Sequence, residues 1–134
     1  MLRIGADLVD TDEVASSVAT LAAAYLKRLF TDAELSRHGG PGTLLGPASH
    51  PLVARHFAAK EAVLKVLRAG EAGVDLRDIE ICRPGGCQGA VRLSGRAAAL
   101  AEAAGICRVF VSLSGTGGLA MAVAAGMEGA DGQR

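Results

Sequence analysis

The segment that most constrains the fold is LVARHFAAKEAVLKVLR, residues 52–68, which predicts one long helix that ends before Gly70 and Gly73. Its apolar side chains occupy most of the helix circumference, and small alanines fill the gaps. One stripe holds Val53, Phe57 and Leu64, and other positions around the helix hold Val63, Val66 and Leu67. A helix that is apolar on so many sides is a buried one, so we expect the other elements to surround it.

The first segment, residues 2–10, alternates with the two-residue period of a strand. Leu2, Ile4, Ala6 and Leu8 fall on one face of this strand, and Arg3, Gly5, Asp7 and Val9 fall on the other. The pattern therefore predicts a strand with one apolar face and one mixed face.

The next segment predicts helices followed by a loop. Asp10 and Glu13 have the spacing of a capping box, which opens a predicted helix that runs to residue 30. Thr31 and Glu34 repeat this signal and predict a further, short helix. The glycine- and proline-rich stretch 38–51 predicts a loop.

The second half of the chain predicts pairs of strands with one helix between them. The predicted strands are residues 78–83, 89–94, 108–114 and 119–125, and the predicted helix is residues 95–105. This order of elements indicates an α+β fold with an antiparallel sheet. We expect a single domain over residues 1–126 and a disordered tail over residues 127–134.

Charge and composition argue against several classes of function. The 14 basic and 14 acidic residues cancel and aromatic residues make up 3% of the chain, so we expect no nucleic-acid partner. Asp7 and Asp10 interrupt the N-terminus where a signal peptide is apolar, and no run reaches the length of a membrane span, so we expect a cytoplasmic protein without a membrane partner. Cys82, Cys87 and Cys107 lack metal-binding spacing and are expected as reduced thiols, although Cys82 and Cys87 could face each other across a hairpin.

Glu61, Lys65 and Arg68 form a narrow charged line along the predicted long helix. Charges on a mostly buried helix either are paired within the fold or line a cleft that binds a charged ligand. A Glu–Lys pair with this spacing stabilises a helix by about 0.2–0.5 kcal/mol, which supports a structural interpretation. Asp7 follows Gly5 in the first strand, and two carboxylates with open positions between them would suit Mg²⁺. Residue types alone leave both interpretations open.

Five motifs occur in a specific order, namely IGADLVDTDEV, FTDAEL, ARHFAAKEAVLK, DIEI and VSLSGTGGLAMAVA. In this order and spacing the chain resembles the holo-acyl-carrier-protein synthases, the small 4′-phosphopantetheinyl transferases, over residues 4–125. The resemblance implies the phosphopantetheinyl transferase fold, with the antiparallel sheet packed against a long central helix, and a homotrimer with active sites between protomers. It also implies an enzyme that uses Mg²⁺ to transfer the 4′-phosphopantetheine group of coenzyme A to a serine of an apo acyl carrier protein, with release of 3′,5′-ADP.

The same resemblance implies roles for individual residues. Asp7 matches the family's G-x-D aspartate and Glu61 its K-E-A glutamate, so both are expected as catalytic residues and magnesium ligands. Glu61 would also accept the serine proton, and Lys65, the third catalytic residue, would stabilise the leaving phosphate. The expected nucleotide-binding residues are His56, Lys60, Lys65, Ser114, Gly115 and Thr116. For His56 and Lys60 the alternative is a solvated charge on the helix surface.

Two departures from the family's motifs bear on function. Gly115 stands where the family has a phosphate-binding histidine, which predicts weaker binding of coenzyme A. Asp12 and Glu13 stand where the family carries a basic residue for its acidic carrier protein, so an unusual carrier, in polyketide rather than fatty-acid synthesis, is one hypothesis. Basic surface for the carrier could instead come from Lys27, Arg28, Arg37 and Arg55. The alternative to an enzyme is a non-catalytic homologue that keeps the fold as an interaction module.

Overall fold

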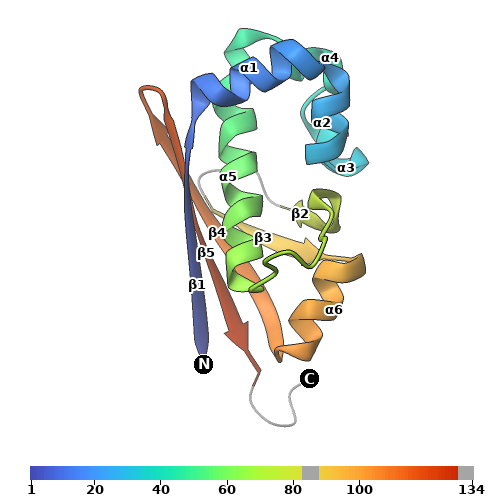
Figure 1. The fold of residues 1–134 in the computed structure, drawn as a ribbon, viewed down its shortest axis with the longest axis vertical. Helices are drawn as coiled ribbons and strands as arrows, with labels where there is room; N and C mark the ends of the chain where they lie inside the picture. The colour runs from blue at the N-terminus through green and yellow to red at the C-terminus, as the bar shows by residue number, and fades with distance from the viewer. Residues whose placement is uncertain (83–87, 130–134) are drawn as a thin grey trace.

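The structure of the protein, a computed structural model, describes residues 1–82 and 88–129 and has one antiparallel sheet with helices on one side of it (Figure 1). The elements are β1 (Leu2–Asp10), α1 (Thr11–Leu21), α2 (Ala23–Leu29), α3 (Asp32–Arg37), α4 (Pro41–Leu44), α5 (His50–Val66), β2 (Ile79–Ile81), β3 (Gln88–Leu93), α6 (Gly95–Ala103), β4 (Ile106–Thr116) and β5 (Leu119–Glu128). The strands lie in the order β1-β5-β4-β3-β2, and every neighbouring pair is antiparallel. The predicted α+β fold with an antiparallel sheet is therefore confirmed. Among the helices of the described residues, none has the length and hydropathy needed to cross a membrane.

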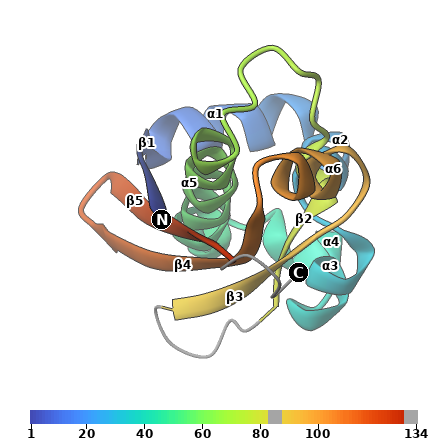
Figure 2. The same cartoon turned by 90° about the horizontal axis from the view of Figure 1, so that it is seen from below.

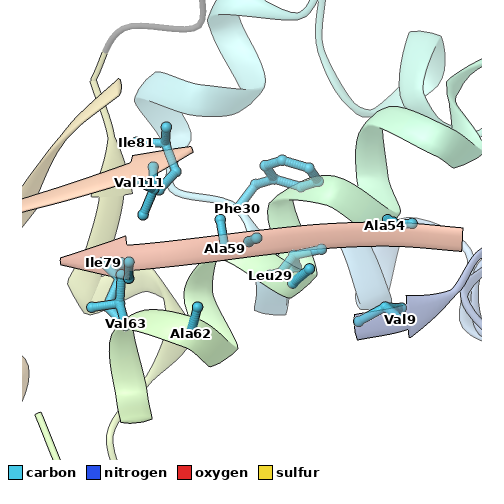
Figure 3. Close-up of a cluster of buried hydrophobic side chains, with 14 of the residues drawn as sticks. Val9, Leu29, Phe30, Ala54, Ala59, Ala62, Val63, Ile79, Ile81 and Val111 are labelled. Atoms are coloured by element: carbon cyan, nitrogen blue, oxygen red, sulfur yellow. The ribbon is translucent and has the colours of Figure 1, made fainter. Parts of the chain in front are cut away.

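Helix α5 lies at the centre of the hydrophobic core, as its apolar circumference predicts. Its fully buried side chains include Val53, Ala54, Ala58, Ala59, Ala62 and Val63. Figure 3 shows side chains of α5 in one cluster with Leu29 of α2, Ile79 of β2 and Val111 of β4. Small residues let the helix come very close to the sheet, because a Cβ atom at Gly5 of β1 would overlap the backbone oxygen of Ala62.

The face of the sheet that points away from α5 is apolar and exposed, and Figure 2 shows β1, β5 and β4 curving around the helix. In β1 the predicted alternation is present, with Gly5 and Val9 buried on the side of α5 while Ile4 is 65% exposed. The register places Ile4 opposite Ala125, which in turn lies opposite Phe110 of β4. The outer apolar face consists of Leu2, Ile4, Leu8, Phe110, Leu119, Met121, Val123 and Met127. The more apolar set of β1 side chains is therefore the one that points away from the core.

The predicted helix over residues 13–30 is two helices, because the chain turns at Ala22, where φ is 49°. The turn changes the direction of the chain so that Val18 of α1 and Leu26 of α2 both reach the core. Residues 21–24, Leu-Ala-Ala-Ala, are strong helix formers, so local preference favours one continuous helix. Tertiary packing therefore overrides local preference at this position.

The two predicted capping boxes have different outcomes. The Asp10 side chain caps α1, but it accepts a hydrogen bond from the amide of Asp12 at 2.8 Å and not from that of Glu13. At α3 the box is complete, since the Glu34 amide donates to Thr31 Oγ1 at 3.1 Å and the Thr31 amide donates to Glu34 Oε1 at 2.8 Å. Only the second prediction is therefore confirmed as a capping box.

The stretch 38–51, predicted as a loop, contains helix α4, a 3₁₀ turn and the start of α5. Pro41 lies in the first turn of α4, and Pro51 lies in the first turn of α5. Proline suits the first turn of a helix as well as a loop, because its missing N–H has no partner there in either case. The prolines therefore mark helix starts that the loop prediction missed.

Strand β5 continues to Glu128, past the domain end predicted at residue 126. This end of the strand is held by an ion pair at 3.5 Å between Arg3 Nε of β1 and Glu128 Oε1. The rest of the predicted tail, residues 130–134, lies outside the described residues, as does Cys87 of the proposed hairpin pair. Residues 127 and 128, assigned to the tail by the sequence, are therefore part of a strand of the sheet.

Glu34 of α3 and Lys60 of α5 form an ion pair inside the core, where both side chains are fully buried. Lys60 Nζ donates to Glu34 Oε1 at 2.6 Å, to the backbone oxygen of Leu29 at 2.6 Å and to that of Leu76 at 3.2 Å. Glu34 Oε2 accepts a hydrogen bond from the amide of Ile81 at 3.0 Å. The three donors of the ammonium are used, and the pair connects α2, α3, α5 and β2.

We predict that Glu34 makes the fold sensitive to acid. Burial alone would raise the pKa of Glu34, but the nearby His56 and Lys60 and the amide of Thr31 lower it from 4.5 to about 2. A carboxyl group with a lowered pKa stabilises the folded state above its unfolded pKa, and this contribution is lost as the pH falls toward the folded pKa. We therefore expect the free energy of unfolding, measured with urea, to fall between about pH 4.5 and pH 2. Glu34→Gln should flatten this part of the curve, and an unchanged slope in the variant would contradict the assignment.

Candidate functional site

Asp7 of β1 and Lys65 of α5 meet where the helix packs closely against the first strand. Lys65 Nζ donates to Asp7 Oδ1 at 3.0 Å and to the backbone oxygen of Ala6 at 2.7 Å. Gly5 permits this approach, because a Cβ atom there would lie 3.0 Å from the Cβ of Lys65. The side chains of Asp7 and Lys65 are 19% and 54% exposed, so a ligand can reach the ion pair.

Glu61 lies one helical turn before Lys65 and is coupled electrostatically to Asp7. Burial raises the pKa of Glu61, the negative charge of Asp7 raises it further, and Lys65 offsets part of this effect. Among the described residues Lys65 forms its ion pair with Asp7, and not with Glu61 as the i, i+4 spacing predicts. The structure therefore brings Asp7, Glu61 and Lys65 into one electrostatic environment between β1 and α5.

The two carboxylates of this site fit Mg²⁺ better than a transition metal. Mg²⁺ is typically bound by one or two carboxylates and completes its shell with water and phosphate oxygens. Within residues 1–82 and 88–129, no group of three or more His, Cys, Asp or Glu is placed to hold a metal, as a structural zinc site would need. A cation next to Glu61 and Asp7 would also relieve the repulsion that raises the pKa of Glu61.

Tyr25 of α2 belongs to the surroundings of Glu61, and sequence reasoning did not identify it. Burial raises the pKa of the Tyr25 phenol, and the negative charge of Glu61 raises it further. A phenol in the field of a carboxylate is a potential hydrogen-bond donor to it. The sequence feature that could have pointed to Tyr25 is that it is the only tyrosine in the chain and lies in a predicted helix next to apolar residues.

His56 and Lys60, expected at the nucleotide, lie in the core instead. Their exposed fractions are 3% and 0%. Lys60 is the partner of Glu34, and the His56 ring packs against Phe30 and His38 with centroid distances of 5.0 and 5.2 Å. His56 Nδ1 lies 3.7 Å from Glu34 Oε2, which is beyond hydrogen-bond distance. Neither side chain is therefore a solvated charge on the helix surface, which was the alternative interpretation.

Ser114, Gly115 and Thr116, all three expected to bind the nucleotide, lie on different faces of the sheet. Gly115 lies opposite Ala120, which is buried on the side of α5. Ser114 and Thr116 lie opposite residues of the outer apolar face. Because neighbouring strand residues alternate between faces, only Gly115 of the three shares the side of the sheet that carries Asp7.

Solved structures with the same architecture come from several organisms. The acyl carrier protein synthase of Plasmodium yoelii with ADP bound has a TM-score of 0.81 and 25% sequence identity, and the alignment covers 96% of each chain. Helicobacter pylori holo-[acyl-carrier-protein] synthase in complex with coenzyme A has a TM-score of 0.74 at 23% identity, covering 92% of this chain and 99% of that one. The predicted phosphopantetheinyl transferase fold is confirmed by these similarities.

Sequence comparison gives relatives of higher identity. The chain is 37% identical over 134 residues to holo-[acyl-carrier-protein] synthase of Desulforudis audaxviator, covering 100% of this chain and 98% of that protein. It is 38% identical over 128 residues to the protein of that name from Moorella thermoacetica, covering 92% of each. The sequence profile of the 4′-phosphopantetheinyl transferase superfamily matches residues 3–124. The chain therefore belongs to the 4′-phosphopantetheinyl transferase superfamily.

Proposed function

We propose that the protein is a holo-[acyl-carrier-protein] synthase, which transfers the 4′-phosphopantetheine group of coenzyme A to a serine of an apo acyl carrier protein. The observation that carries this proposal is the family match over residues 3–124, which includes the site formed by Asp7, Glu61 and Lys65. We place the reaction in the cytoplasm, in fatty-acid or polyketide synthesis. The products are holo acyl carrier protein and 3′,5′-ADP.

The reaction requires a proton acceptor and a positive charge near the phosphates. The serine oxygen forms a new bond to the phosphorus that carries the pantetheine arm, and the pyrophosphate bond breaks so that its electron pair leaves with 3′,5′-ADP. Glu61 suits the role of acceptor for the serine proton, directly or through a water, because burial and the charge of Asp7 raise its pKa. Lys65 supplies the positive charge, and its exposed ammonium can contact a phosphate while it stays close to Asp7.

Asp7 and Glu61 would be the residues that hold Mg²⁺. When bound, Mg²⁺ neutralises negative charge on the pyrophosphate and its leaving group. Without a cation, Lys65 balances the charge of Asp7 by the ion pair at 3.0 Å. The chain thus holds these two carboxylates in one electrostatic environment before any ligand binds, which is the preorganisation that phosphoryl-type transfer needs.

We predict that Glu61→Gln abolishes most of the transfer. The protein is incubated with coenzyme A, Mg²⁺ and a panel of apo acyl carrier proteins, and the carriers are weighed by mass spectrometry. We expect the wild type to add the phosphopantetheine mass to at least one carrier and Glu61→Gln to be slower by about 10²-fold or more. Glu71→Gln, an exposed residue beyond α5, is the matched control and should retain the wild-type rate.

The same experiment separates the enzyme from an interaction module. Gly115 favours the module, because the family's phosphate-binding histidine is missing there. A module would bind coenzyme A or a carrier without modifying any member of the panel, and that result would overturn the proposed activity. Equal transfer rates for wild type and Glu61→Gln would support the proposed activity but contradict the role of Glu61 as proton acceptor.

The carrier protein would approach a surface in which α1 is acidic. Asp12 and Glu13 lie in the first turn of α1, where negative charge interacts favourably with the helix dipole. These acids therefore stabilise the helix whether or not they face a partner. Exposed Lys27 and Arg28 in the last turn of α2 are available to an acidic carrier instead, so we keep acidic carriers in the panel.

We further propose that the protein forms a homotrimer through its outer apolar face. This face extends over β1, β5 and β4, and the register places its side chains in adjacent rows. Contiguous apolar surface of this kind typically marks a protein interface. Ser114 and Thr116 point to the same side of the sheet, which would place their hydroxyl groups near a neighbouring protomer.

Val123→Glu should break this assembly, because it places a charge in the middle of the outer apolar face. We expect the wild type to sediment as a trimer and Val123→Glu as a monomer in analytical ultracentrifugation. Ala103→Glu, with the same change of charge on the exposed end of α6, is the control and should remain trimeric. A monomeric wild type, or a trimeric Val123→Glu, would show that this face is not the interface.

A further inference from the structure

A cavity lies between α6 and the strands β3 and β4, apart from the candidate site. Its volume is about 450 Å³, within the range of about 300–1,000 Å³ that is typical of small-molecule pockets. In the sheet, β5 and β4 separate this region from β1, which carries Asp7, and none of the residues that line the cavity belongs to α5. The residues assigned to the transfer reaction therefore make no use of this space.

The cavity exists because β3 and β4 diverge. Their pairing ends at Ala90 and Phe110, and β3 then continues beside β2 as far as Leu93, while β4 stays paired with β5. Figure 1 shows α6 in the corner that the two strands leave. Ala98 and Ala101 line the cavity from α6, and their side chains are too small to fill it.

The walls of the cavity are aliphatic. Among the described residues that line it none is aromatic, and the six apolar ones are Val91, Leu93, Ala98, Ala101, Ile106 and Val109. Val91, Leu93 and Ala98 are only half-buried, so part of this apolar surface lies in water. Such walls offer no ring on which a planar ligand can stack, whereas a flexible aliphatic chain can contact them along its length. Burial of that chain would remove apolar surface of both partners from water.

Two charged residues, Arg108 of β4 and Glu102 of α6, also line the cavity, and both are exposed, which places them at its mouth. The planar guanidinium of Arg108 can donate two parallel hydrogen bonds to a carboxylate. Glu102 can pair with an ammonium group, but that pair lacks the two-pronged geometry of arginine with a carboxylate. The charges at the mouth therefore favour a ligand with one carboxylate at the end of its apolar chain.

We propose that this cavity binds a single-chain aliphatic carboxylate, with the chain against the aliphatic walls and the carboxylate at Arg108. The site goes beyond the proposed transfer activity and does not depend on it. Residues 130–134 of the chain follow Gly129, whose amide donates to the backbone oxygen of Gly105 beside the cavity at 3.0 Å. Their sequence, Ala-Asp-Gly-Gln-Arg, has no aliphatic side chain larger than alanine, so it matches the walls less well than a fatty acid does.

Calorimetric titration of the full-length protein with hexanoate, octanoate and decanoate tests this site. We expect the Kd to fall about fourfold for each added methylene, which is the effect of burying one such group. Ala98→Leu fills part of the cavity and should raise the Kd for decanoate by at least about tenfold. Ala99→Leu, the same change at the exposed neighbouring position of α6, is the matched control and should bind like the wild type.

Arg108→Gln tests the charged end of the ligand separately. It should raise the Kd for decanoate about threefold, the size expected for an exposed ion pair, and leave the Kd for decanol unchanged. Arg28→Gln, an exposed arginine of α2, is the control and should bind decanoate like the wild type.

Several results would overturn the proposal. They are a Kd that does not change with chain length, equal Kd values for wild type and Ala98→Leu, and decylamine that binds as tightly as decanoate. A variant that ends at Gly129 tests the tail as the alternative occupant. If this variant binds decanoate and the full-length protein does not, residues 130–134 occupy the cavity and the proposal is wrong. A change in sedimentation of Ala98→Leu but not of Ala99→Leu would assign the cavity to a contact between copies of the chain, which would overturn it as well.

Discussion

The close contact between α5 and β1 at Gly5 is the constraint on which both the core and the candidate site depend. With no side chain at Gly5, the strand lies directly against the backbone of Ala62. The same contact places Lys65 Nζ 3.0 Å from Asp7 and brings Glu61 into the field of that carboxylate. A larger residue at position 5 would push the helix away from the strand and separate the charges. The same contact therefore both buries α5 and assembles the candidate site.

Lys60 and Glu61 are adjacent in the sequence of α5 but have different roles, because successive residues of a helix point in directions about 100° apart. Lys60 points inward and is held by Glu34 and two backbone oxygens. Glu61 is only partly buried and lies in the electrostatic field of Asp7 of β1. In the same helix, Lys60 therefore holds the surrounding elements in place, and the next residue, Glu61, belongs to the candidate site.

The sequence predicts well what local periodicity determines, namely the long helix, the strand alternation and the complete cap of α3 by Thr31. It does not reveal that Lys60 is buried, because its partner Glu34 lies 26 residues away and already has a local role in the cap. The turn at Ala22 is equally hidden, since Leu21 and the alanines beside it favour a helix. The family resemblance identified Asp7 and Glu61, but only the three-dimensional structure shows that Lys65 forms its ion pair with Asp7.

We propose that the α5–β1 contact forms one site for Mg²⁺ and the phosphates of coenzyme A. Calorimetric titration of coenzyme A with and without Mg²⁺, in the wild type and in Asp7→Asn, tests this claim most directly. We predict that Mg²⁺ tightens binding by the wild type and that Asp7→Asn loses most of this effect while it still binds coenzyme A. An equal effect of Mg²⁺ on both proteins would contradict the claim.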